Sequence, residues 1–122
     1  MKDENLKNKN FIDSSKNAFN GIIYTIKTQK NIKIQLIIAL IVIISCIFLK
    51  LDITDCMFIT FSIMLVIITE VINTSIEETV NLCTDKFHPI AKIAKDVSAG
   101  AVVLASINSI IIAILILIKY LK

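Results

Sequence analysis

The residues best suited to chemistry lie in one stretch, Glu70-Val-Ile-Asn-Thr-Ser-Ile-Glu77-Glu78. In a helix, the spacing i, i+3, i+7 places Glu70, Asn73 and Glu77 on one face. The preceding run, residues 56–69, contains no charged side chain. As a helix it is roughly 21 Å long, shorter than the roughly 30 Å hydrocarbon core of a bilayer. A helix that crosses the bilayer must therefore carry Glu70 into the apolar layer or to its edge. Because a charge at that depth costs on the order of 2.5–3.5 kcal/mol, the face predicts a functional site.

Composition predicts an integral membrane protein. Of 122 residues, 56% are hydrophobic, and the mean hydropathy is +0.80. The net charge of +3 comes from 13 lysines without any arginine. A lysine-rich N-terminal region is typical of a topology signal, and without arginine the chain has little with which to recognise nucleic acid. The three cysteines show no CxxC spacing, so we expect neither a disulfide nor a zinc site.

Hydropathy and helical periodicity predict an all-α membrane protein that forms a single membrane-embedded domain over residues 1–122. A polar tail over residues 1–11 precedes an amphipathic helix that should lie at the membrane surface. Three transmembrane helices should follow, the first two joined by a tight turn and the last two by a cytoplasmic loop. The expected bounds are about 12–30 for the surface helix, about 32–51, 56–80 and 97–118 for the spans, and 81–96 for the loop.

The lysine distribution predicts a cytoplasmic N-terminus. With three spans, the loop over residues 81–96 then lies inside and the C-terminal residues 119–122 lie outside. Ten of the 13 lysines fall on the inner side in this arrangement, as the positive-inside rule requires. The polar residues of the second span, Lys95 and Asp96 before the third, and the surface helix should therefore meet at the inner membrane face.

Phosphoryl transfer to a lipid alcohol is one reaction that would use this set of residues. One carboxylate accepts the hydroxyl proton, a second holds Mg²⁺ against the phosphates, and a lysine offsets their charge. No GxxxxGK[ST] sequence is present, which excludes a P-loop kinase. Composition and spacing alone fit a proton or ion carrier nearly as well, and each carboxylate singly could also just reach water at a helix end.

Two segments resemble the signatures of the bacterial diacylglycerol kinase family. The stretch from Glu70 to Glu77 is similar to the family pattern E-x-x-N-[ST]-x-I-E. The stretch Phe87-His-Pro-Ile-Ala-Lys-Ile-Ala-Lys95-Asp96-Val-Ser-Ala-Gly-Ala-Val is similar to its second pattern, an aromatic-His pair followed by A-K-D and a small-residue helix. The likeness covers roughly residues 12–118, and the second segment looks like the Gram-positive branch, whose preferred lipid is generally undecaprenol.

The resemblance implies a homotrimeric lipid kinase of the bacterial cytoplasmic membrane, with active sites shared between subunits and MgATP as phosphate donor. By matching position, Glu70 would be the catalytic base, Asn73 would support it, and Glu77 would bind the metal. The residues expected at the nucleotide share the matched loop and helix start, with Asn17 of the surface helix added to them: Lys86, Phe87, His88, Lys95, Asp96 and Asn17.

Four positions depart from the family pattern. Gln29 stands where the family usually has a glutamate that is a second metal ligand, and a neutral amide oxygen binds Mg²⁺ more weakly than a carboxylate does. Asn81 stands where an aspartate is common, and Asn10 and Asn17 do not match an Arg and a Tyr found near the nucleotide in some members. The alternative interpretation is therefore a catalytically impaired homologue or a small proton- or ion-conducting membrane oligomer.

Overall fold

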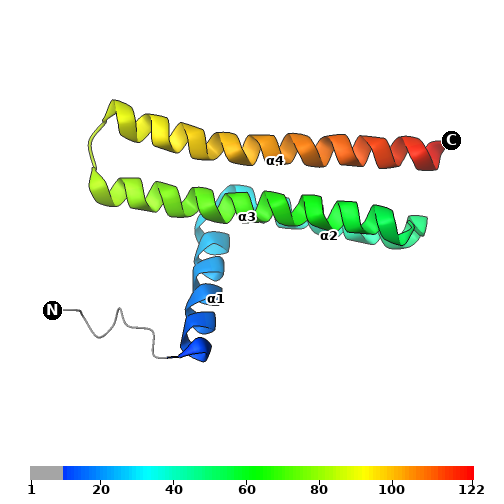
Figure 1. The fold of residues 1–122 in the computed structure, drawn as a ribbon, viewed down its shortest axis with the longest axis horizontal. Coiled ribbons are helices and arrows are strands. Elements are labelled where there is room, and N and C mark those ends of the chain that lie inside the picture. Colours follow the sequence, from blue (N-terminus) through cyan, green and yellow to red (C-terminus); the bar gives the residue numbers. More distant parts are fainter. Residues whose placement is uncertain (1–9) are drawn as a thin grey trace.

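The computed structural model describes residues 10–122, which form four helices (Figure 1). Helices α2, α3 and α4 run alongside one another, whereas α1 runs across their direction. The predicted all-α fold is confirmed for these residues, and most of the predicted tail over residues 1–11 lies outside them. The bounds are Phe11–Thr28 for α1, Lys30–Leu49 for α2, Ile53–Cys83 for α3 and Pro89–Leu121 for α4.

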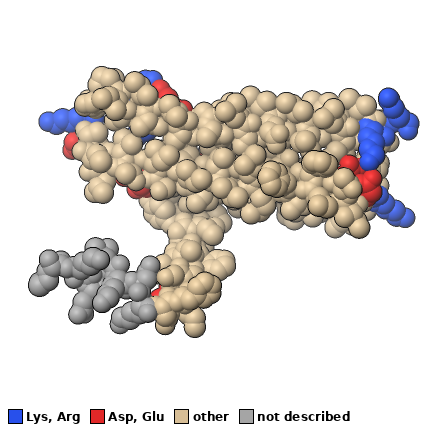
Figure 2. All heavy atoms as spheres, in the orientation of Figure 1, with Lys and Arg blue, Asp and Glu red and all other residues tan. Residues whose placement is uncertain are grey.

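Helices α2, α3 and α4 are each long and apolar enough to cross a membrane, which confirms the predicted spans in number. Figure 2 shows lysines and acidic residues gathered toward the two ends of this bundle, with a largely uncharged band between them on the face in view. With 31 residues, α3 is about 46 Å long at 1.5 Å per residue, longer than the roughly 30 Å hydrocarbon core. Its ends therefore extend beyond the apolar layer.

The predicted loop over residues 81–96 is wrong, because the connection comprises only residues 84–88. Pro89 occupies the start of α4, where a missing backbone N–H is no loss and the fixed φ angle favours a helix. His88 caps that helix, since its Nδ1 accepts a hydrogen bond from the Ile90 N–H at 3.1 Å. The proline therefore begins a helix instead of extending a loop.

The other predicted boundaries differ less from the structure. The span placed at about 32–51 is α2, which begins and ends two residues earlier. The span placed at about 56–80 is α3, which is three residues longer at each end. The span placed at about 97–118 is α4, which begins eight residues earlier for the reason just given. The predicted surface helix over residues 12–30 ends at Thr28, because Gln29 adopts an extended backbone (φ −105°, ψ 117°) that redirects the chain into α2.

The interior of the bundle is more polar than apolar. Helix α3 is central: it packs along α4 and against α2, whereas the Cα atoms of α2 and α4 stay more than 8 Å apart in the described part of the chain. Small residues such as Ser62, Ser98 and Ala105 are buried where α3 and α4 meet, which lets the two backbones approach closely. Most large apolar side chains face outward, as expected for a protein whose solvent is lipid.

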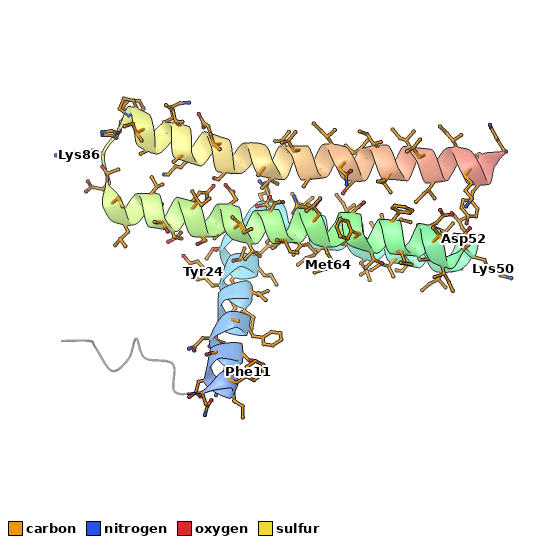
Figure 3. The ribbon with its side chains drawn as sticks, in the orientation of Figure 1. Phe11, Tyr24, Lys50, Asp52, Met64 and Lys86 are labelled. Atoms are coloured by element: carbon orange, nitrogen blue, oxygen red, sulfur yellow. The ribbon has the colours of Figure 1, made fainter. Side chains whose placement is uncertain are left out.

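A polar cluster joins three segments at one end of the bundle, here called the turn end because the α2–α3 turn lies there (Asp52 and Lys50 in Figure 3). Lys119 Nζ lies 2.9 Å from the carboxylates of both Asp52 and Asp55. The Tyr120 hydroxyl donates to Asp55 Oδ2 at 2.8 Å and accepts from the Asp52 N–H at 3.0 Å. The end of α4 is thereby fixed against the start of α3, which sets the register of the two helices.

This cluster predicts a pH-dependent stability. The Asp55 N–H and then the Lys119 ammonium group hold the pKa of Asp52 below its ordinary value of 3.8. A lowered carboxylate pKa stabilises the fold above pH 3.8, and this contribution is lost as the pH falls through the lower folded-state pKa. The thermal unfolding midpoint in detergent should therefore decrease over this acidic range. The midpoint of the Asp52→Asn variant should decrease less. Asp85→Asn at the opposite end is the control and should follow the unmodified protein.

Candidate active site

Glu70 is a buried carboxylate in the middle helix. Its side chain is only 2% exposed. Gln35 of α2 donates a hydrogen bond from Nε2 to Glu70 Oε1 at 3.2 Å, and the Thr74 hydroxyl donates to the Glu70 backbone carbonyl at 3.0 Å. The apolar side chains of residues 56–69 precede it on the same helix. The carboxylate is thus buried between helices, with one protein donor on its oxygen.

Asn73 connects Glu77 to α4. Its Nδ2 donates to Glu77 Oε1 at 3.1 Å, and its Oδ1 accepts from the Ser98 hydroxyl at 2.6 Å. Both the Asn73 and Ser98 side chains are buried, whereas Glu77 is half-buried. On the predicted face, Asn73 and Glu77 are therefore joined by a hydrogen bond and linked to α4, and Glu70 lies two helical turns before Glu77 on the same helix.

A cavity of about 640 Å³ lies at the other end of the bundle, here called the loop end, between the end of α3 and the start of α4 (Lys86 in Figure 3). Its wall contains all of the loop and α4 residues predicted to contact a nucleotide, joined by neighbours from both helices. These predicted residues are Lys86, Phe87, His88, Lys95 and Asp96.

Two lysines of this cavity differ in their pairing. Lys95 Nζ binds Asn81 Oδ1 at 2.7 Å and so bridges α4 to α3. Asp96 pairs with Lys92 at 2.6 Å, one helical turn away, and both side chains of that pair are more than half exposed. The neutral partner leaves the positive charge of Lys95 uncompensated, which suits it to contact an anion. The position of Asn81, where the family commonly has an aspartate, therefore changes the charge of the site.

Gln29 and Asn17 lie apart from this cavity. Gln29 is half-buried at the junction of α1 and α2, and Asn17 lies on the exposed surface of α1. Neither residue lines the cavity at the loop end. Their predicted roles at the metal and the nucleotide therefore stay predictions. Within residues 10–122, no three His, Cys, Asp or Glu side chains cluster in a way that would hold a metal ion.

Three further residues belong to the site but were not predicted as functional. Neither Gln35 nor Ser98 was given a predicted role, and Asn81 was named only as a departure from the family pattern. Each is recognised only by its partner, which is Glu70, Asn73 and Lys95 respectively. A polar residue next to or within an apolar span is the one sequence signal that points to them, because such groups require a buried partner.

The family model for prokaryotic diacylglycerol kinase matches residues 16–117 of the chain. The chain belongs to the prokaryotic diacylglycerol kinase family. Membership confirms both the resemblance inferred from the sequence and the expected enzyme class, a lipid kinase. The matched range includes α2 and α3 in full and most of α1 and α4, together with every residue assigned above to the site.

Two curated members of the diacylglycerol kinase family are similar to the chain over most of its length. It is 41% identical to an undecaprenol kinase of Bacillus subtilis over 106 residues, which are 87% of this chain and 86% of the relative. It is 36% identical to a diacylglycerol kinase of Synechocystis over 104 residues, which are 84% of this chain and 59% of that longer relative. The two relatives carry names that specify different lipid substrates.

Proposed function

We propose that this chain transfers the γ-phosphoryl group of ATP to the hydroxyl of a membrane lipid alcohol, undecaprenol or diacylglycerol, at the cytoplasmic face of the bacterial membrane. The observation that carries the proposal is the position of Glu70. This carboxylate is buried within the bundle, and Asn73 and Glu77 follow it on the same helix toward the charged cavity at the loop end. A buried base within an apolar span and a charged, open region beyond it are the two parts that such a reaction needs.

In the proposed reaction, Glu70 accepts the proton of the lipid hydroxyl while the alcohol oxygen attacks the γ-phosphorus. The new oxygen–phosphorus bond forms as the bond from the γ-phosphorus to the bridging β–γ oxygen breaks, and ADP leaves. The hydrogen bond from Gln35 fixes the orientation of the Glu70 carboxylate. Burial of Glu70 excludes water, which would otherwise compete with the alcohol as the acceptor of the phosphoryl group.

The cavity at the loop end suits the nucleotide. Lys95 and Lys86 supply positive charge for phosphates, and the exposed ring of Phe87 offers an apolar face for a base. His88 uses Nδ1 to cap α4, which leaves Nε2 for a polar contact. We therefore assign the two lysines, Phe87 and His88 to the nucleotide site. Asp96, which lines the same wall, belongs to that site as well.

The donor groups near Glu77 suit Mg²⁺. The available ligand atoms are carboxylate and amide oxygens, which a hard cation prefers. Glu77 would hold the ion, with Gln29 as a weaker oxygen ligand, and Asn73 keeps Glu77 oriented through its hydrogen bond. When bound, the metal neutralises charge on the transferring phosphates.

Topology and assembly follow from charge and exposure. The lysines of α1 and of the loop end favour a cytoplasmic location for both. The direction of α1 across the three spans supports a position along the membrane surface (Figure 1). Gln29 and Asn17 lie outside the cavity of their own chain, so a homotrimer with shared active sites is the arrangement in which they would meet a nucleotide.

The test of the proposed function is direct. Purified protein in mixed micelles receives Mg²⁺, ATP labelled in its γ-phosphate, and either undecaprenol or diacylglycerol. We expect labelled lipid phosphate from at least one alcohol. If neither alcohol is labelled, the chain is not a kinase for these lipids, and proton flux measured in vesicles would then test the ion-conducting alternative.

Gln29 favours a second candidate, a catalytically impaired homologue. If the amide weakens metal binding, Gln29→Glu should lower the Mg²⁺ concentration at half-maximal activity by about tenfold or more, because a charged ligand binds a hard cation more tightly. The measurement is a Mg²⁺ titration of phosphotransfer, with Gln29→Asn as the neutral control. Activity that appears only in Gln29→Glu would identify a decayed enzyme, whereas equal titrations would remove residue 29 from the metal site.

A further inference from the structure

An apolar groove lies between α2 and α4. Both helices pack against α3, while their Cα atoms stay more than 8 Å apart over residues 10–122, and this separation leaves space beside α3. Two cavities of about 240 and 270 Å³ occupy this space and share Val42 in their walls. The first begins at Gln35 and the second extends to Leu49, a distance along α2 of about 21 Å at 1.5 Å per residue.

The groove has one unpartnered polar atom. Gln35 lines its inner part, and Gln35 Oε1 is buried without accepting a hydrogen bond from any group of residues 10–122. The nearby serine hydroxyls are already used, since Ser106 donates to the Val102 carbonyl at 2.9 Å and Ser109 to the Ser62 carbonyl at 3.2 Å. A buried acceptor without a hydrogen bond costs free energy, so a ligand that donates a hydrogen bond to this oxygen would be stabilised here.

The neighbour of this oxygen identifies the ligand. On the same amide group, Gln35 Nε2 donates to Glu70, the proposed base. A ligand that fits the groove therefore has a long hydrocarbon part, and at its inner end a donor next to Glu70. A lipid alcohol has both features, and the groove is lined mostly by apolar side chains up to Gln35. A helix from a second copy of the chain could also fill the groove, but nothing would require it to place a hydroxyl group beside Gln35.

We propose that Gln35 is the residue that recognises the lipid alcohol: its Oε1 accepts the substrate hydroxyl, while the hydrocarbon chain lies in the α2–α4 groove. This proposal rests on the proposed function, because it assigns the alcohol of that reaction. Gln35 is a positioning residue. It holds the hydroxyl beside Glu70, and rotation about the C–O bond turns the same proton toward the carboxylate for transfer.

The test compares binding of a prenol with binding of its methyl ether, which has the same chain but no proton to donate. The protein in micelles, without ATP, is photolabelled by a diazirine-bearing prenol, and the unlabelled compounds compete. We expect labels on α2 and α4 along the groove, and a prenol that competes about tenfold better than its ether, the effect of one hydrogen bond to an otherwise unsatisfied acceptor. Gln35→Leu should abolish this preference while the label remains in the groove.

Two further variants separate the possible outcomes. Asn31→Leu replaces an exposed amide of α2 outside the groove and should keep the preference for the alcohol. Glu70→Gln should also keep it, even though we expect that variant to lose phosphotransfer. Failure of the proposed function would appear as no lipid phosphate with the preference intact. If Gln35→Leu retains the preference, or if the labels fall outside the groove, the role of Gln35 is wrong even in an active kinase.

Discussion

Exchange of Glu70 for Gln is expected to lower the rate of lipid phosphorylation by about 10²–10⁴-fold, the contribution of a positioned general base. The amide has the same shape and still occupies the site next to Gln35, but it cannot take the hydroxyl proton. The loss should appear in kcat, measured as labelled phosphate transferred to lipid at saturating ATP.

The matched control for this variant is Glu78→Gln, which changes an exposed carboxylate on the same helix. It should retain the activity of the unmodified protein, and both variants should elute as oligomers of unchanged size. If Glu70→Gln keeps full activity, a different residue accepts the proton and the proposed mechanism is wrong.

Exchange of Glu77 for Gln should produce the second-largest effect, a decrease of about 10²-fold at a limiting Mg²⁺ concentration. The substitution removes the charged metal ligand but preserves an oxygen that can accept the hydrogen bond from Asn73. A metal-site role predicts that added Mg²⁺ restores part of the rate and that the KM of the lipid alcohol stays the same.

The informative measurement is therefore a Mg²⁺ titration of phosphotransfer at several lipid concentrations. A lower rate that no Mg²⁺ concentration improves would indicate that Glu77 acts on the structure of α3 and not on a metal ion. A changed lipid KM would instead place Glu77 at the alcohol.

The sequence was sufficient for the helices and for one face of the middle span. Long apolar runs define spans by length, and the i, i+3, i+7 spacing places Glu70, Asn73 and Glu77 together without knowledge of the neighbours. The Asn73–Glu77 hydrogen bond is the local contact that such spacing predicts. The matched loop likewise brought Lys86 and His88 to one cavity, because they are close in the chain.

Contacts between distant parts of the chain could not be predicted in this way. Gln35 and Glu70 are 35 residues apart, and Asp55 and Tyr120 are 65 residues apart. Helical periodicity gives the face of each helix but not the depth at which two faces meet, so neither pair was foreseen. The loop boundary failed for a different reason. Proline is unfavourable inside a helix but favoured at its first position, and Pro89 occupies that first position in α4.

The length of α3 has a consequence for the enzyme in different membranes. In the proposed reaction, one helix would carry Glu70 at the depth of the lipid alcohol and continue to Asn81 beside the charged cavity. The distance between the two halves of the site is thus fixed by the protein, whereas the height of the lipid hydroxyl is fixed by the surrounding acyl chains. Hydrophobic mismatch displaces one relative to the other, so the composition of the bilayer itself becomes a determinant of how well acceptor and donor are aligned.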